Sequence, residues 1–168
     1  MKTLSLTLTA GLLVVALSAP AVSAQQSASI LAQATVQTPL TVTGVNNLDF
    51  GNVFPGVNST VLLADAGAGH FQITGVLNAE IDVSFSSLPA TLVNGGNSMP
   101  ISYTGGWNTA ANPGTATAFT PATGLIERLD AATGELHVYL GGTLTVAGNQ
   151  PAGLYQATIT LDAAYTGN

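Results

Sequence analysis

The chain has 168 residues, of which only 6% are charged and none is cysteine. Two basic residues stand against eight acidic ones, a formal net charge of −6 at pH 7 that repels nucleic acid and anionic lipid surfaces. We therefore expect neither as a partner. Without cysteines, the chain must be stabilised by apolar burial and backbone pairing and not by disulfides.

The N-terminus has the three parts of a cleavable export signal. Lys2 supplies a positive charge, residues 4–17 are apolar or small, and residues 22–24 offer small side chains for cleavage. We predict a secretion signal peptide over residues 1–24 and one mature domain over residues 25–168. The mature protein is then expected in the periplasm, at the cell surface or outside the cell, without a membrane span.

The rest of the chain is a series of short strands separated by turns. The first alternating segment covers residues 30–43, with a break at Pro39; its apolar side is Ile30, Ala32, Ala34, Val36, Leu40 and Val42. Further short strands are expected, in chain order, at residues 48–53, 60–63, 70–74, 79–85, 100–103, 125–132, 135–140 and 143–146. Asn94-Gly95-Gly96-Asn97 predicts a reversal, and residues 105–121 a long loop that holds Trp107.

The last segment has the clearest strand pattern in the chain. From Gly153 to Tyr165 apolar and polar residues alternate, which is typical of a strand with one buried face. The predicted inner face is Tyr155, Ala157, Ile159, Leu161, Ala163 and Tyr165. The predicted outer face is Gln156, Thr158, Thr160 and Asp162.

About eight to ten short strands at this spacing predict an all-β fold. We expect an immunoglobulin-like antiparallel β-sandwich with Greek-key connections.

Three segments carry a resemblance to a known family: residues 34–42 with 48–51 after them, residues 134–144, and residues 153–155. On these the mature chain resembles DUF4402, a domain of unknown function found in secreted bacterial β-sandwich proteins. The resemblance implies a fold and a compartment but transfers no catalytic residue.

The terminal segment also resembles pilins of the chaperone-usher type and spore-coat-U-like secreted pilus subunits. Such subunits end in a glycine, an alternating strand and a tyrosine twelve positions later, as Gly153 and Tyr165 do here. Their sheet lacks one strand, which a periplasmic chaperone and then the next subunit supply. The resemblance implies a donated strand, whose candidate positions are Ile30, Ala32, Ala34 and Val36. Against it, the chain has no cysteine pair and continues three residues past the tyrosine, so a self-complete sandwich is the alternative.

Candidate catalytic and metal-binding residues are few. Glu135 and His137 share one face of a predicted strand, and His70 lies near Asp65, but neither pair has a third ligand. No sequence pattern groups a nucleophile with a base. We therefore expect no enzymatic activity, no cofactor and no metal.

These observations favour an exported structural or surface protein, such as a pilus-like or fimbria-like subunit. Its expected partners are other copies of itself, in a homopolymer formed by strand donation or sheet-edge pairing, or a periplasmic chaperone. Two alternatives remain open: a monomeric secreted binding module that binds glycan through the Trp107 loop, and an uncharacterised hydrolase.

Overall fold

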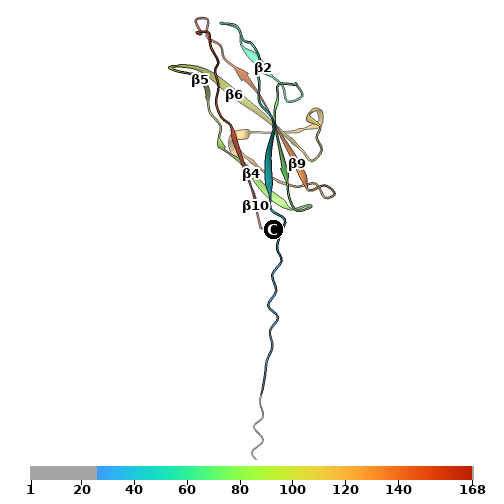
Figure 1. Ribbon diagram of the computed structural model, residues 1–168. Helices are drawn as coiled ribbons and strands as arrows, with labels where there is room; N and C mark the ends of the chain where they lie inside the picture. The colour runs from blue at the N-terminus through green and yellow to red at the C-terminus, as the bar shows by residue number, and fades with distance from the viewer. Residues whose placement is uncertain (1–25, 168) are drawn as a thin grey trace, which may run out of the picture. The chain divides into compact units, whose positions relative to one another are not determined.

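The computed structural model describes residues 26–167 (Figure 1), so the predicted signal peptide lies outside the described residues. The chain divides into two units, residues 1–35 and 36–168. The described part of the first unit, residues 26–35, is exposed and contains no helix or strand. The predicted strand over residues 30–43 is therefore wrong in its first part, because alternation alone makes no strand without a partner to pair with.

The described part of the second unit contains ten strands and two short 3₁₀ helices. They are β1 (Thr41–Asn46), β2 (Ser59–Val61), β3 (Gly69–Thr74), β4 (Glu80–Ser87), β5 (Thr91–Asn94), β6 (Asn97–Asn108), η1 (Pro113–Thr115), β7 (Thr117–Phe119), η2 (Pro121–Thr123), β8 (Leu125–Arg128), β9 (Glu135–Leu144) and β10 (Thr160–Tyr165).

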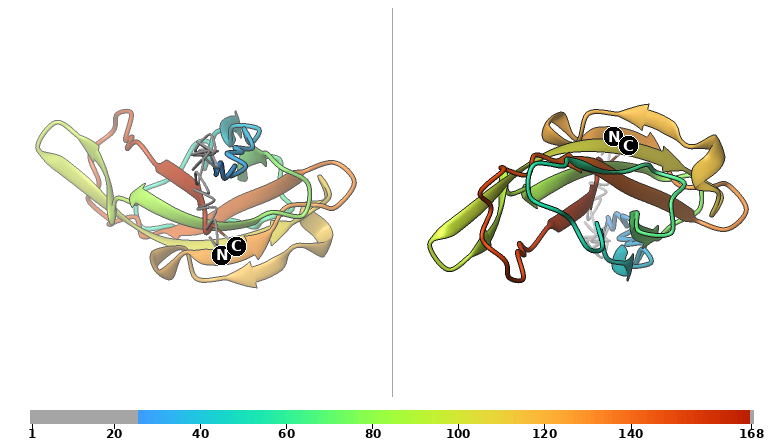
Figure 2. Two further views of the ribbon diagram at one scale, coloured as in Figure 1. Left: turned by 90° about the horizontal axis from the view of Figure 1, so that it is seen from below. Right: turned by 90° about the horizontal axis from the view of Figure 1, so that it is seen from above.

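The strands form two antiparallel sheets (Figures 1 and 2). The larger sheet has the order β1-β3-β9-β6-β5, with β2 added beside β9 and β7 beside β6. The smaller sheet has the order β10-β4-β8. The predicted all-β antiparallel sandwich is confirmed, whereas the immunoglobulin-like Greek key stays a prediction. β1 is an edge strand of the larger sheet, and β10 is an edge strand of the smaller sheet.

Two cores fill the sandwich. The first is formed by Ile73, Ile81, Val83, Leu129, Leu136, Val138 and Leu161. The second is formed by Met99, Ile101, Leu144 and Val146. The predicted inward faces of β4 and of the terminal segment are confirmed, because their apolar positions are buried or half-buried and most of the residues between them are exposed.

The two ends of this unit differ, and we name them the base and the tip. The base carries Tyr165, the last residue of β10. The tip carries residues 51–58 and 147–154, two loops joined by a hydrogen bond of 3.1 Å from the amide of Gly56 to the carbonyl of Ala147. In Figure 1 β2 and β5 lie toward the tip.

Glycines account for one difference from the predicted strands. Residues 135–140 and 143–146 were expected as two strands, but β9 runs without a break through Gly141 and Gly142. A Cβ at Gly141 would collide with the carbonyl oxygen of Val61, and one at Gly142 would lie 2.5 Å from that of Ser102. The glycines therefore serve the close approach of β2 and β6 to β9, not a turn.

Candidate functional site

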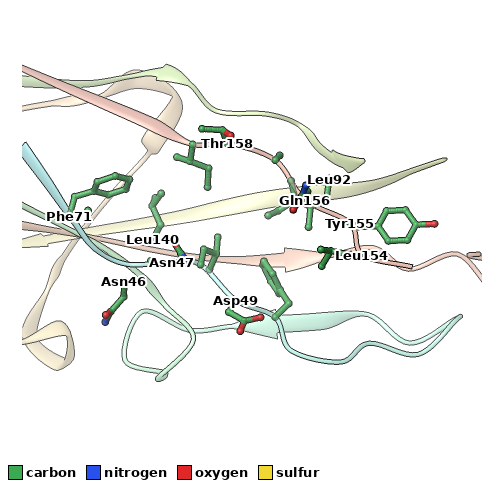
Figure 3. A pocket seen from close by; sticks show the side chains of 17 residues that line it. Asn46, Asn47, Asp49, Phe71, Leu92, Leu140, Leu154, Tyr155, Gln156 and Thr158 are labelled. Carbon is green, nitrogen blue, oxygen red and sulfur yellow. The ribbon is translucent and has the colours of Figure 1, made fainter. Parts of the chain in front are cut away.

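A groove of about 600 Å³ opens beside the larger sheet, between β1 with the chain after it and the chain that precedes β10 (Figure 3). One wall comes from residues 44–50, the end of β1 and the chain after it, and the other from residues 154–159, just before β10. The floor includes Phe71 and Leu140, which belong to β3 and β9 of the larger sheet. The groove therefore has an apolar floor and is flanked by two segments of extended chain.

The first wall is an edge without cover. β1 pairs with β3 on one side only and ends the larger sheet on the other. Every residue of β1 is exposed, including the apolar Val42 and Val45. The predicted strand at residues 48–53 is wrong, since that stretch forms no ladder, although the amide of Asp49 donates to the carbonyl of Gly67 at 2.8 Å. A sheet edge with both faces open is a site where another strand can pair.

The second wall is also unpaired on its groove side. Gln156 exchanges two main-chain hydrogen bonds of 3.1 Å with Val93. Neighbouring residues of an extended chain point their N–H and C=O groups to opposite sides, so those of Tyr155 and Ala157 point away from Val93 and toward the groove. The predicted terminal strand is thus correct in its faces but too long, because its ladder with β4 begins only at Thr160.

The groove is closed at the base. There the Tyr165 hydroxyl accepts a hydrogen bond of 2.8 Å from the amide of Val76 and donates one of 3.0 Å to the carbonyl of Thr38. The groove lining stops before this point, at Gly44 and Ile159. At the other end the lining reaches Phe50 and Leu154, next to the exposed loops of the tip.

The structure places the sequence-predicted site residues in three groups. Tyr155, Ala157 and Ile159 line the groove wall, whereas Leu161, Ala163 and Tyr165 face the first core. Gly153, at the tip, has a φ of 151° and no space for a Cβ, because the side chain of Asn94 is adjacent. The candidate donor positions Ile30, Ala32, Ala34 and Val36 are exposed, Ile30 and Val36 at 95%.

The groove floor and its first wall were not predicted. Phe71 and Leu140 follow an ordinary core pattern, and nothing local marks residues 44–50 as a wall. The groove arises because no strand lies between the edges of β1 and β10 in the described chain. Such a gap between distant segments leaves no signal in a single sequence.

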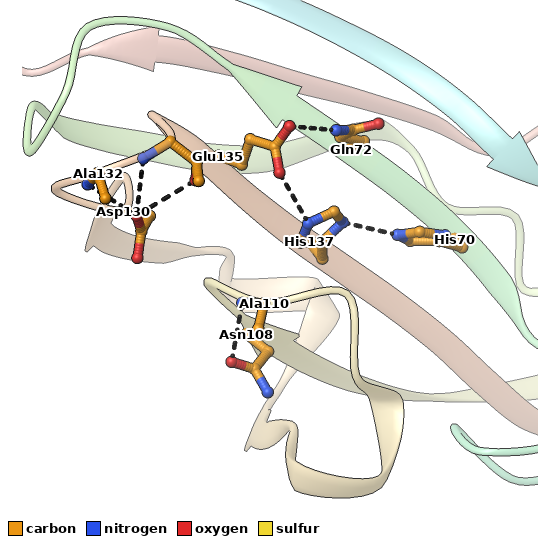
Figure 4. A network of polar contacts seen from close by, with 9 residues as sticks. His70, Gln72, Asn108, Ala110, Asp130, Ala132, Glu135 and His137 are labelled. Atoms are coloured by element: carbon orange, nitrogen blue, oxygen red, sulfur yellow. Dashed lines mark hydrogen bonds and ion pairs between the residues drawn. The ribbon is translucent and has the colours of Figure 1, made fainter.

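A polar cluster, separate from the groove, lies on β3 and β9 (Figure 4). His70 Nε2 and His137 Nδ1 are 3.0 Å apart, and His137 Nε2 lies 3.5 Å from a carboxylate oxygen of Glu135. Gln72 Nε2 donates to the other oxygen of Glu135 at 2.9 Å. Burial, and next the charge of His137, lower the pKa of His70. Two hydrogen bonds, His70–His137 and Gln72–Glu135, thus join β3 to β9, whereas the buried His137 Nε2 has no hydrogen-bond partner and only approaches Glu135 on its own strand.

This cluster does not match the expected His70–Asp65 pair. Asp65 instead accepts a hydrogen bond of 2.7 Å from the amide of Leu62 within its own turn. No three acidic or histidine side chains among residues 26–167 are grouped to hold a metal ion.

Trp107 does not lie in a loop, contrary to prediction. It belongs to β6, pairs with Thr117 and Val138, and packs against the first core. Its half-buried side chain contributes to folding, so the glycan-binding alternative loses the exposed loop on which it depended.

Comparison with known proteins gives one family. The model described as "Domain of unknown function (DUF4402)" matches residues 40–165, which include both groove walls and β10. No curated protein matches the chain. Among the described residues, no helix has the length and hydrophobicity needed to cross a membrane.

Proposed function

We propose that this chain, which belongs to the DUF4402 family of unknown function, is an exported structural or surface protein whose copies assemble by β-strand donation. Family membership confirms the first resemblance predicted from the sequence. The pilin resemblance, the export and the assembly stay proposals. The observation that carries this function is the groove between the unpaired edge of β1 and residues 154–159.

The groove has the features that an added strand requires. The main chain of such a strand pairs with exposed edges, and its alternate side chains enter apolar pockets. Here the edges are β1 and residues 154–159, and the floor carries Phe71, Leu92 and Leu140. An open edge of this kind is otherwise an aggregation hazard, so a specific occupant would also protect it.

The occupant that we propose is residues 30–36 of a second copy. Their apolar side chains recur every second residue, which places Ile30, Ala32, Ala34 and Val36 on one face of a strand. The segment is exposed and carries no charge. No charged group therefore has to lose its hydration water when the segment enters the apolar groove. Seven extended residues span about 23 Å, comparable to the six-residue wall at 154–159.

Export is supported by the N-terminal pattern and has its own test. If the signal is cleaved after Ala24, the exported product begins at Gln25. Mass spectrometry of the exported protein measures this start directly. An exported product that retains Lys2 would contradict the cleavage.

Assembly is tested on the mature protein by size-exclusion chromatography and negative-stain microscopy. Wild type should form polymers, and deletion of residues 25–33 should abolish them. Ile30→Asp should do the same, because a carboxylate facing the floor would lack a partner. Leu31→Asp is the matched control: Leu31 is adjacent but on the opposite face, so polymers should persist.

A different result would reject strand donation. A wild type that stays monomeric at high concentration, together with a deletion that leaves the melting temperature unchanged, describes a self-complete sandwich. Equal effects of Ile30→Asp and Leu31→Asp would show that the segment does not bind through one face.

A further inference from the structure

We infer that the first wall of the groove, residues 44–50, is a proton-sensitive gate. The wall is fixed while His70 and His137 share a hydrogen bond, and it is released when both rings are protonated. This inference adds regulation to the groove. Its consequence for assembly rests on the proposed function, whereas the release of the wall can be measured independently.

Two main-chain contacts tie the first wall to the segment that leads into β3. The amide of Asp49 donates a hydrogen bond of 2.8 Å to the carbonyl of Gly67. Asn46, the last residue of β1, pairs with His70 beyond an irregularity in the β1–β3 register. Both contacts are therefore made by the four residues that end at His70.

This segment is packed closely between the wall and β9. A Cβ at Gly67 would collide with the carbonyl oxygen of Asp49. One at Gly69 would lie 3.3 Å from the Cβ of Leu48 in the wall and 3.4 Å from that of Leu140 in β9. Because main chain packed this closely transmits strain, a shift at the start of β3 also moves the wall.

The contact between the two histidines limits how many protons they can hold. His70 Nε2 and His137 Nδ1 face each other at 3.0 Å, so one nitrogen carries the proton and the other accepts it (Figure 4). A neutral ring has one N–H and one acceptor nitrogen, whereas a protonated ring has an N–H at both positions. One added proton leaves an acceptor in the pair. A second one places N–H against N–H and breaks the bond.

The charged groups around the pair favour a proton on His137. In the described chain, Glu135 is the only carboxylate within ion-pair distance of either ring, at 3.5 Å from His137 Nε2. The register partners on β1 and β6, Asn46 and Asn108, are uncharged, and so are residues 109–116 after β6. Asp65, in the loop before β3, accepts from an amide of its own turn. Two charged rings thus share one counter-charge, which lies beside His137.

His70 is therefore the ring that moves. His137 is 3% exposed and lies on β9 between two paired strands, whereas His70 is only half-buried. The ring of Tyr139 stacks on His70 at a centroid distance of 4.6 Å, but its buried hydroxyl has no hydrogen-bond partner within residues 26–167. Burial raises the pKa of Tyr139, so this group stays neutral. Burial, and next the charge of His137, lower the pKa of His70, so the bond is lost as the pH falls below 6.5.

Release of the wall changes the groove at the edge that an added strand would use. With His70 displaced, residues 44–50 are no longer fixed opposite residues 154–159. A strand that must pair along a defined edge then binds less tightly. We therefore expect the groove to be ready for a strand at neutral pH and less so in mild acid.

Amide exchange with water, measured by NMR, tests the gate in the mature chain with Ile30→Asp. Ile30 is 95% exposed, so the change leaves the fold intact, and by the proposed function it leaves the groove unoccupied. The amide of Gln156 in the second wall is a matched reference, because it also donates to a main-chain carbonyl, that of Val93. From about pH 7.5 to about pH 5.5, exchange at Asp49 relative to Gln156 should rise about threefold or more.

Two controls assign this change to the histidine pair. With His70→Gln added, the side chain can still donate to His137 but takes up no proton, so the ratio should stay constant. Without that variant, the midpoint of the change should coincide with the titration of the His70 ring, followed by its own NMR signals. A constant ratio in the chain that keeps His70, an equal rise with His70→Gln, or a midpoint apart from that of the ring would each overturn the gate.

Assembly of the chain without Ile30→Asp separates this inference from the function on which it rests. Size-exclusion chromatography should give fewer polymers at about pH 5.5 than at about pH 7.5 for wild type, but equal amounts for His70→Gln. Polymers of wild type that are independent of pH would overturn the regulatory role of the gate while strand donation stands. A wild type without polymers at either pH would overturn the proposed function, and the exchange ratio would still decide whether the wall is released.

Discussion

The hydroxyl of Tyr165, near the end of the chain, donates a hydrogen bond of 3.0 Å to the carbonyl of Thr38, 127 residues away. The same oxygen accepts from the amide of Val76 at 2.8 Å. This one side chain thus joins the last strand, the chain before β1 and the turn after β3. It closes the base while the rest of the space between β1 and β10 stays open.

Replacing Tyr165 by Phe should reduce the free energy of unfolding by about 1–3 kcal/mol, since two hydrogen bonds are lost and the part-buried Val76 amide keeps no partner. Denaturant unfolding measures the change. Tyr155→Phe is the control, because its hydroxyl makes one exposed bond of 2.9 Å to Pro151 and should cost less than about 1 kcal/mol. Equal losses would mean that Tyr165 does not hold the base closed.

Truncations along the terminal segment should separate the core from the groove. Leu161 is 6% exposed and packs in the first core, so Leu161→Ala should cost about 2–5 kcal/mol in the monomer. Ile159 is only half-buried beside the groove, so Ile159→Ala should cost less in the monomer. Thr160→Ala, on the outer face, should be nearly silent. Urea unfolding of the three variants gives the order; similar losses at Thr160 and Leu161 would contradict the faces.

The local pattern predicted much of the sandwich. Asn94-Gly95-Gly96-Asn97 was expected to reverse the chain, and it connects β5 to β6 with Asn94 opposite Asn97. The alternation from Gly153 to Tyr165 gave the correct inner face. Both features depend on residues close in sequence, for which glycine conformation and side-chain period are sufficient information.

What was not predicted depends on partners distant in sequence. Residues 30–36 alternate as regularly as the terminal segment, yet they form no strand in the described chain, since pairing needs a second strand. Gly141-Gly142 resembled a turn because a glycine pair at a turn and one at a close strand approach look the same in the sequence. The groove exists only where residues 44–50 and residues 154–159 lie opposite each other, and that arrangement is visible only in the structure.

Gly141→Ala should destabilise the fold by about 1–3 kcal/mol. An added Cβ would collide with the main chain at Val61 and lie 2.8 Å from the Thr104 hydroxyl, so β2 or β6 would have to move away from β9. Gly148→Ala is the control, since a Cβ there would meet no atom within 4 Å. Thermal unfolding compares the two. A melting temperature that falls equally in both would show that strand approach is not the reason for Gly141.

The pair of His70 and His137 should make the fold sensitive to mild acid. Burial and the neighbouring His137 lower the pKa of His70 below its ordinary 6.5, so the folded state favours the neutral ring. The unfolded chain then takes up this proton first, and the stability contributed by neutral His70 is lost as the pH falls from about 7 through 6.5 toward the lower folded pKa.

In His70→Gln the amide can still donate to His137 Nδ1 but does not titrate, so its free energy of unfolding should change less over this range. Denaturant unfolding at intervals between pH 7.5 and 5 (~0.5-unit steps) measures both slopes. Asp130→Asn is the control. The amides of Thr133 and Ala132 lower the pKa of Asp130 from 3.8, so the pH dependence of stability that Asp130 contributes lies below the pH range of this experiment. Parallel curves for wild type and His70→Gln would show that His70 does not carry the acid sensitivity.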